Sequence, residues 1–139
     1  MAQTYNPILI VEDDRQIVGM LTRILEGAGF SVNASYLGSE ALDSVLKNRP
    51  SLVILDLKLP DIDGYQVCRM LKQLYPPSQV PVLILTGMTQ PVDQLRGFAH
   101  GADAYLTKPC TPAELLKAVN TLFEQSHTPP ADPETPFAD

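Results

Sequence analysis

The sequence lacks several features that would place the protein in other structural classes. It contains no tryptophan and only two cysteines, Cys68 and Cys110, in 139 residues. Two cysteines do not make the disulfide framework of a small secreted domain, and free thiols suit a reducing compartment. No apolar stretch approaches the roughly 20 residues that span a bilayer, and residues 1–7 lack the basic and apolar parts of a secretory signal. We therefore expect a cytoplasmic protein with no membrane segment.

Positive charge is also scarce. The chain has 10 Lys and Arg against 16 Asp and Glu, which gives a formal net charge of −6, and the basic residues do not cluster. Nucleic-acid binding needs a basic face that neutralises phosphates. We therefore expect no direct contact of this chain with nucleic acid, and partners that are proteins or a cation.

What the sequence does contain is a series of short apolar runs. Three of them are almost unbroken β-branched residues and leucines, which is typical of strands buried on both faces of a parallel sheet. A weaker run and an alternating segment bring the predicted strands to five. In chain order they are Ile8–Val11, Phe30–Ser35, Leu52–Leu55, Val82–Leu85 and Ala104–Leu106.

Each run is followed by apolar residues at helical spacing. The five stripes lie within residues 17–25, 41–46, 67–75, 95–99 and 115–123. The last follows Thr111-Pro112-Ala113-Glu114, which predicts a capping box with proline at the first helical position. After about Gln125 the periodicity ends. We therefore predict one domain over residues 1–125 and a proline-rich acidic tail or linker over residues 126–139.

The alternation of strands and helices predicts an α/β fold, with a doubly wound five-stranded parallel sheet in the order 2-1-3-4-5 and five helices. Ligands of such sheets bind at the carboxyl ends of the strands. Four of the predicted strands end in polar residues: Glu12-Asp13-Asp14, Asp56, Thr86 and Lys108. We expect these side chains to meet at one edge of the sheet.

This set of residues suits a divalent cation and a phosphoryl group. Carboxylates held close together repel unless a cation neutralises them. Mg²⁺ prefers oxygen ligands and binds one or two carboxylates together with phosphate oxygens. An aspartate can accept a phosphoryl group, and that transfer depends mainly on positioning and charge neutralisation. The residues alone therefore predict a metal-dependent anion or phosphoryl site.

Over residues 7–125 the chain resembles the receiver domain of two-component response regulators, which has a flavodoxin-like fold. Four motifs carry the resemblance, in order and at suitable spacing. They are Ile-Leu-Ile-Val-Glu12-Asp13-Asp14, Asp56-Leu-Lys-Leu-Pro60-Asp-Ile-Asp63-Gly64, Leu85-Thr86-Gly87 and Gly101-Ala-Asp-Ala-Tyr105-Leu-Thr-Lys108-Pro109.

The resemblance implies that Asp56 is the phosphoacceptor of a signalling switch. The phosphoryl group would come from a sensor histidine kinase or a histidine phosphotransfer protein. The output would be a downstream effector protein or a C-terminal output domain. The protein would not be an enzyme in the ordinary sense, although Mg²⁺-dependent phosphotransfer and slow self-dephosphorylation are expected of it.

The resemblance also implies roles for the surrounding residues. Mg²⁺ would be held by Glu12, Asp13, Asp56 and the backbone carbonyl of Lys58. Thr86 and Lys108 would contact the phosphoryl group, Thr86 and Tyr105 would be the switch residues, and the Lys108-Pro109 peptide would be cis. Independently of the resemblance, Asp14 is expected as a helix cap or as an acid next to the metal ligands, Asp63 and Gly64 as the entry of a helix, and Cys68 as a core residue.

Three other functions are compatible with parts of this pattern. A phosphatase of the haloacid dehalogenase type would have a second acid two residues after the nucleophile, where this chain has Lys58. A degenerate receiver would bind proteins without phosphorylation, but this chain retains all five site residues. A dinucleotide-binding domain would need a glycine-rich loop after the first strand, which the sequence lacks.

The chain also departs from the family pattern. Glu12 stands where many relatives have aspartate, and Lys58 and Met88 occupy variable positions that tune the phosphoryl lifetime in the family. Relatives that pair through the fourth helix, fifth strand and fifth helix often have an acid before the tyrosine and arginines at the end of the last helix. Here Ala104 precedes Tyr105, and the sequence from Thr121 to Gln125 has no arginine. This mode of pairing is therefore not expected.

Overall fold

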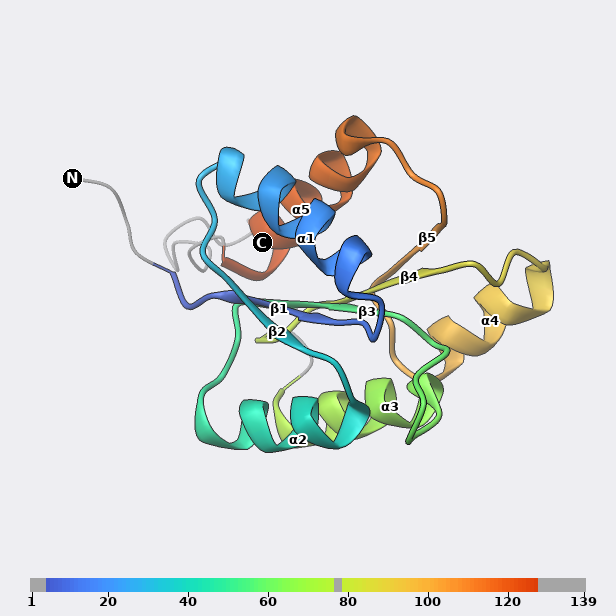
Figure 1. The fold of residues 1–139 in the computed structure, drawn as a ribbon. Helices are drawn as coiled ribbons and strands as arrows, with labels where there is room; N and C mark the ends of the chain where they lie inside the picture. Colours follow the sequence, from blue (N-terminus) through green and yellow to red (C-terminus); the bar gives the residue numbers. More distant parts are fainter. Residues whose placement is uncertain (1–4, 77–78, 128–139) are drawn as a thin grey trace, which may run out of the picture.

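The structure, a computed structural model, describes residues 5–76 and 79–127 (Figure 1). Its strands are β1 (Ile8–Val11), β2 (Val32–Ser35), β3 (Leu52–Leu55), β4 (Val82–Thr86) and β5 (Ala104–Thr107). They form one parallel sheet in the order β2-β1-β3-β4-β5, so the predicted topology is confirmed. The predicted strand β2 starts two residues too early, because Phe30 precedes the paired segment and packs edge-on against Phe123, with ring centroids 5.2 Å apart.

Helices cover both faces of the sheet (Figure 1). They are α1 (Arg15–Gly27), α2 (Gly38–Lys47), α3 (Gly64–Leu74), α4 (Pro91–Ala99) and α5 (Pro112–His127). Successive strand residues point to opposite faces. Leu9 and Val11 of β1 therefore pack into the core with α2 and α3. Ile8 and Ile10 pack into the core with α1 and α5. This two-sided burial explains why the strands are unbroken apolar runs.

The caps of the helices combine predicted and unexpected residues. Thr111 and Glu114 form the predicted capping box of α5, with the Glu114 side chain accepting from Thr111 N at 2.8 Å and the Thr111 hydroxyl accepting from Glu114 N at 3.1 Å. The start of α2 is capped from a distance. The Asp61 carboxylate, in the loop before α3, accepts from Gly38 N at 2.8 Å and from Ser39 N at 3.0 Å. That loop and the start of α2 are thereby fixed to each other.

Helix α4 differs from its sequence pattern. The pattern correctly predicts a helix ending near Gly101, but its apolar stripe does not face the core: Leu95 is 69% exposed and Phe98 is 46% exposed. Within this helix the buried residue is Gly97. A Cβ at Gly97 would lie 3.0 Å from Ile84 Cδ1 and 3.0 Å from Tyr105 Cδ2, so α4 approaches the sheet through a glycine. An apolar surface on α4 is left open to solvent.

Two expectations concern the ends and the setting of the domain. Helix α5 reaches His127, so the first two residues of the predicted tail continue the helix. The rest of that tail, residues 128–139, lies outside the described residues. None of the helices in the described part of the chain combines the length and apolarity needed to cross a bilayer.

Candidate functional site

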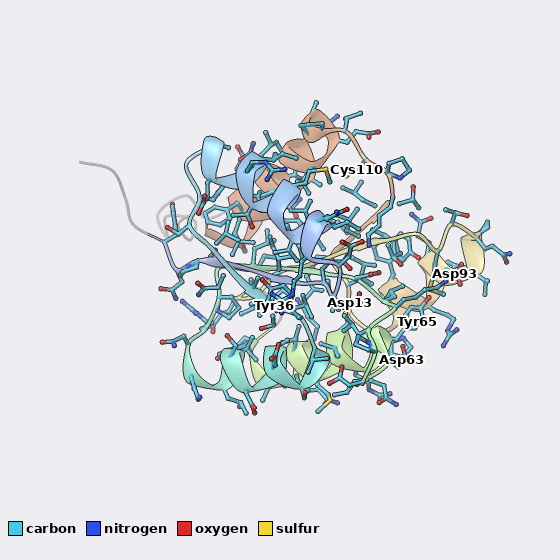
Figure 2. The ribbon with its side chains drawn as sticks, in the orientation of Figure 1. Asp13, Tyr36, Asp63, Tyr65, Asp93 and Cys110 are labelled. Atoms are coloured by element: carbon cyan, nitrogen blue, oxygen red, sulfur yellow. The ribbon has the colours of Figure 1, made fainter. Side chains whose placement is uncertain are left out.

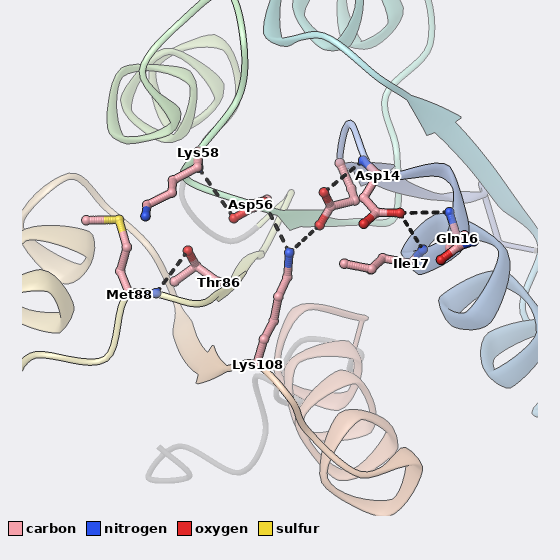
Figure 3. Close-up of polar contacts among 9 residues, drawn as sticks. Asp14, Gln16, Ile17, Asp56, Lys58, Thr86, Met88 and Lys108 are labelled. Atoms are coloured by element: carbon pink, nitrogen blue, oxygen red, sulfur yellow. Dashed lines mark hydrogen bonds and ion pairs between the residues drawn. The ribbon is translucent and has the colours of Figure 1, made fainter.

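The polar residues predicted from the sequence lie at the carboxyl ends of four strands. Glu12 and Asp13 follow β1, Asp56 follows β3, Thr86 ends β4 and Lys108 follows β5. Figure 3 shows Lys108 reaching from the end of β5 toward Asp56 and the end of β1. Because the strands are parallel, their chain ends bring these groups to one edge, as predicted.

Lys108 joins two acids that come from different strands. Its ammonium Nζ lies 2.5 Å from Glu12 Oε1 and 3.1 Å from Asp56 Oδ2. The second Glu12 oxygen, Oε2, accepts from the backbone N–H of Asp14 at 3.0 Å. Glu12 is 3% exposed and Asp56 is 7% exposed. Buried carboxylates are costly without partners, so the Lys108 ammonium is an important stabilising partner for both.

The environment of the site shifts the pKa values of Glu12 and Lys108. Burial raises the pKa of Glu12, and the hydrogen bonds from Lys108 and Asp14 only partly offset that effect. Burial alone would lower the pKa of Lys108, but the hydrogen bond to Glu12 and the negative charge of Asp56 outweigh it and raise this pKa. Lys108 is therefore held as a cation among the acids.

Three carboxylates gather at this edge. Glu12, Asp13 and Asp56 each offer an oxygen, and these oxygens lie within 4.8 Å of one another. Asp13 is exposed, whereas the other two acids are buried. A set of hard oxygen donors with one side open to solvent fits Mg²⁺, which keeps several waters when it binds proteins. The Lys58 backbone lies beside this cluster, since its N–H donates to Asp56 Oδ1 at 3.4 Å; the role of its carbonyl as a ligand stays a prediction.

Thr86 and Tyr105 both contact the loop that follows β4. The fully buried Thr86 accepts from Met88 N through Oγ1 at 3.4 Å, as Figure 3 shows. The hydroxyl of Tyr105, which is 9% exposed, donates to the Met88 carbonyl at 2.8 Å. Burial, followed by the charges of Tyr65 and Asp93, raises the pKa of Tyr105 to about 12. Both predicted switch residues thus hydrogen-bond the backbone of Met88, Thr86 at its N–H group and Tyr105 at its carbonyl group.

The predicted cap at Asp14, the predicted helix entry at Asp63-Gly64 and the predicted cis peptide are confirmed. Asp14 caps α1, its Oδ1 accepting from Gln16 N at 2.9 Å and from Ile17 N at 3.3 Å. Asp63 caps α3 by accepting from Tyr65 N at 3.0 Å. The Lys108-Pro109 peptide is cis.

Gly64 has a role that the sequence analysis missed. A Cβ at this position would lie 2.4 Å from Leu57 Cα and 2.8 Å from the Asp56 carbonyl oxygen, closer than real atoms approach. The Gly64 N–H donates to the Leu57 carbonyl at 3.0 Å. The start of α3 therefore packs directly on the backbone next to Asp56, and only glycine leaves room for it. In the sequence, the one sign of this close approach was that Gly64 follows Asp63 at the predicted start of a helix.

Chemically, the site joins a nucleophile to groups that neutralise negative charge. The Asp56 carboxylate can attack an electrophilic phosphorus atom. Lys108 supplies a fixed positive charge 3.1 Å from Asp56 Oδ2. The acids offer oxygens for a cation, and the transfer of a phosphoryl group depends on this kind of positioned charge.

Comparisons with known proteins give one family. The family model for the response regulator receiver domain matches residues 8–120. The DNA-binding response regulator MtrA of Mycolicibacterium smegmatis is 42% identical over 125 residues, which cover 90% of this chain and 54% of MtrA. The transcriptional regulatory protein CreB of Escherichia coli is 40% identical over 118 residues, which cover 85% of this chain and 51% of CreB. The chain thus spans about half the length of these curated relatives.

Solved structures agree with this result. The CheY-like response regulator receiver domain protein of Methanospirillum hungatei superposes with a TM-score of 0.83 at 28% sequence identity. The match covers 89% of this chain and 98% of that one. The fold and the sequence motifs therefore point to the same family.

Proposed function

The chain belongs to the response regulator receiver domain family, and from the geometry of its acidic edge we propose that it accepts a phosphoryl group on Asp56 and changes its surface in response. One observation carries this proposal. The buried Asp56 carboxylate lies 3.1 Å from the Lys108 ammonium, within a cluster of carboxylate oxygens suited to a cation. This contact supports the proposal, because it sets a carboxylate nucleophile beside a positive charge.

The acids Glu12, Asp13 and Asp56, with the Lys58 carbonyl, would hold Mg²⁺. When bound, Mg²⁺ neutralises part of the charge of the carboxylates and of the phosphoryl oxygens. Lys108 would contribute the second positive charge. Removing any one of these charges would leave repulsion between the acids and the incoming group.

The transfer itself is a displacement at phosphorus. An Asp56 oxygen attacks the phosphorus of a phosphohistidine on the partner, an O–P bond forms, the N–P bond breaks, and the imidazole nitrogen keeps the electron pair. The partner would be a sensor histidine kinase or a histidine phosphotransfer protein. Slow attack of water on the same phosphorus releases inorganic phosphate and restores the Asp56 carboxylate.

The switch would act through Thr86 and Lys108. The transferred group adds negative charge next to both residues, and the Thr86 hydroxyl can donate to a phosphoryl oxygen. The hydrogen bond that Thr86 Oγ1 accepts from Met88 N would then change. The environment of Tyr105 would change with it, because the Tyr105 hydroxyl donates to the Met88 carbonyl. Differential contacts of this kind shift a two-state equilibrium.

The docking surface for the phosphodonor lies next to Lys108. An apolar crevice of about 200 Å³ runs between α1 and the Lys108-Pro109 segment, lined by residues that include Ile17, Met20 and Cys110. Met20 is 43% exposed. Lys108, which contacts Asp56, also lines this crevice, so the crevice suits apolar side chains on a helix of the donor protein.

We propose that the face of the domain around α4 and α5 transmits the signal to the output partner. The exposed apolar surface of α4, formed by Val92, Leu95 and Phe98, would bind an effector protein or a C-terminal output domain. The longer relatives named above are a DNA-binding and a transcriptional regulator, but direct contact of this domain with nucleic acid is not proposed, because its net charge is −6. We also keep the cytoplasmic location as a prediction.

The test is chemical phosphorylation of the isolated chain. Incubation with acetyl phosphate and Mg²⁺, followed by intact-mass measurement, should add one phosphoryl group to the wild type and none to Asp56→Asn. Asp43→Asn, which changes an exposed aspartate on α2, is the matched control and should be labelled like the wild type.

Other outcomes identify the alternatives. Undiminished labelling of Asp56→Asn would remove Asp56 as the acceptor. Rapid multiple turnover of a small phosphate ester would favour a phosphatase. Absence of labelling in the wild type, with intact Mg²⁺ binding, would favour a module that binds proteins without phosphorylation.

A further inference from the structure

Helix α2 begins without a cap from its own N-cap residue. That residue, Leu37, makes no side-chain hydrogen bond to the helix. The first turn of a helix leaves backbone N–H groups without intrahelical partners, and a nearby acceptor oxygen usually satisfies them. For Gly38 N and Ser39 N the acceptor is Asp61, which lies 23 residues after Gly38. Each carboxylate oxygen accepts from one N–H group, so a single side chain holds two backbone groups of α2.

Asp61 belongs to the loop that connects the phosphoacceptor with α3. Near the start of this loop, Lys58 N donates to Asp56 Oδ1 at 3.4 Å. At its far end, Gly64 N donates to the Leu57 carbonyl at 3.0 Å. Between these two points the Lys58 side chain is exposed. Among the described residues, the hydrogen bonds of Asp61 are those that join this loop to α2.

The start of α2 also packs closely against the end of the loop. A Cβ at Gly38 would lie 3.2 Å from Ile62 Cβ and 3.1 Å from Val67 Cγ2, so α2 approaches the loop and α3 through a glycine. Figure 2 shows Asp63, the last residue of the loop, on the side of the sheet that α2 and α3 cover. The loop therefore cannot shift far without breaking the bonds of Asp61 or moving α2.

We propose that Asp61 is a positioning residue of the metal site, which holds the loop on α2 and so keeps the Lys58 backbone in place beside Asp56 for Mg²⁺. The inference rests on the proposed function, in which the Lys58 carbonyl is a metal ligand. A loop that is already held in place loses less conformational entropy when the ion binds, so Asp61 should raise the affinity for Mg²⁺. By the same coupling, bound Mg²⁺ should reduce the opening of the bonds from Gly38 N and Ser39 N.

The test compares two carboxylates at the same end of α2, in the full chain. Asp61→Ala removes the bonds between the loop and the helix. Glu40→Ala removes the same charge and a comparable bond, because Glu40 Oε1 accepts from Tyr36 N at 2.9 Å, but this bond does not involve the loop. For each protein, NMR titration measures the Kd for Mg²⁺. Amide hydrogen exchange of Gly38 and Ser39 is measured with and without Mg²⁺.

In Asp61→Ala we expect the Kd for Mg²⁺ to rise about 10-fold, the lower end of the range for residues that orient metal ligands. The rise should persist at about 1 M salt, where the loss of an exposed negative charge is screened. Glu40→Ala should keep the wild-type Kd. In the wild type and in Glu40→Ala, Mg²⁺ should slow the exchange of Gly38 and Ser39. Asp61→Asn, which keeps the side-chain shape and one acceptor oxygen, should raise the Kd less than Asp61→Ala and replaces it if the alanine variant is unstable.

Two results would overturn the role of Asp61 while the wild type binds Mg²⁺ normally. One is an equal Kd in Asp61→Ala and Glu40→Ala, and the other is a rise in Kd that disappears at high salt. If the wild type itself bound no Mg²⁺, the metal site of the proposed function would fail, and the inference about Asp61 would fail with it.

Discussion

The ammonium nitrogen of Lys108 lies 2.5 Å from Oε1 of Glu12, a contact between residues 96 positions apart in the chain. Many receiver domains have aspartate where this chain has Glu12, and the longer side chain reaches the lysine directly. The same ammonium contacts Asp56 at 3.1 Å. We therefore expect Lys108 both to stabilise the acidic edge and, as proposed, to contact the phosphoryl group.

Replacement of Lys108 should affect both properties. Lys108→Ala leaves two buried carboxylates without their shared cation, so the free energy of unfolding should fall by about 1–3 kcal/mol, less than for a fully buried pair because the lysine side chain is 23% exposed. Some labelling of Asp56 by acetyl phosphate should remain, but the change in the Tyr105 environment on phosphorylation should be largely lost. Urea unfolding and aromatic NMR signals measure the two effects.

Lys117→Ala is the control for Lys108→Ala. Lys117 is exposed on α5, so its replacement should change the free energy of unfolding by no more than about 0.5 kcal/mol. The response of Tyr105 to phosphorylation should stay the same. A normal Tyr105 response in Lys108→Ala would remove Lys108 from the switch.

Mg²⁺ should raise the thermal stability of the wild type, because a cation relieves repulsion among Glu12, Asp13 and Asp56. Asp13→Asn should lose most of the Mg²⁺-dependent rise in Tm, while its Tm without Mg²⁺ should equal or exceed that of the wild type. Differential scanning calorimetry with and without Mg²⁺ measures this. Asp43→Asn should keep the full rise, and an equal loss in both variants would mean that Mg²⁺ acts elsewhere.

The fold was largely predictable because its strands are buried on both faces, which leaves a local signature in the sequence. The site was predictable for a related reason: parallel strands bring residues such as Asp56 and Lys108 to one edge. The apolar stripe of α4 correctly predicted a helix but not the exposure of its apolar residues, because periodicity shows that a helix has an apolar side but not whether a neighbour covers that side. The contact of Asp61 with the start of α2 could not be predicted, because it depends on how the loop before α3 and α2 are placed in space.

The glycine at the entry of α3 gives a steric prediction. In Gly64→Ala the new Cβ would lie 2.4 Å from Leu57 Cα, and both groups belong to backbone that cannot move freely. We expect a loss of about 1–3 kcal/mol in the free energy of unfolding and slower phosphorylation of Asp56, because the adjoining segment must shift. Gly27→Ala, at the end of α1 with open space around its Cβ, should be neutral or slightly stabilising. Equal stabilities of the two variants would contradict the close approach.

Asp61 gives a prediction about pH. Hydrogen bonds from the backbone at Ser39 and Gly38 lower the pKa of Asp61 from 3.8 to about 2. A carboxylate with a lowered pKa in the folded state contributes stability above its unfolded pKa, and this contribution is lost as the pH falls through the folded pKa. The stability difference between wild type and Asp61→Asn should therefore shrink as the pH falls from about 4 toward about 2. Urea unfolding along this series measures it; a difference that is independent of pH would show that the Asp61 charge does not cap α2.

The two thiols should react at very different rates. Burial raises the pKa of Cys68 to about 12, and its Sγ lies in the core with a contact to the His100 carbonyl at 3.6 Å. Cys110 is only half-buried and lines the crevice beside α1, although partial burial raises its pKa as well. Since the thiolate is the reactive form, iodoacetamide at mildly alkaline pH should modify Cys110 first and Cys68 only after unfolding.

The same modification tests the proposed docking crevice. An amide group added at Cys110 would occupy space between α1 and the Lys108-Pro109 segment, so alkylation should slow phosphotransfer from a histidine donor protein. It should slow labelling by acetyl phosphate much less, because that small donor needs no docking surface. Cys110→Ser, treated with the same reagent, controls for effects at other sites. Equal slowing with both donors would place the effect on the Asp56 site itself rather than on the crevice.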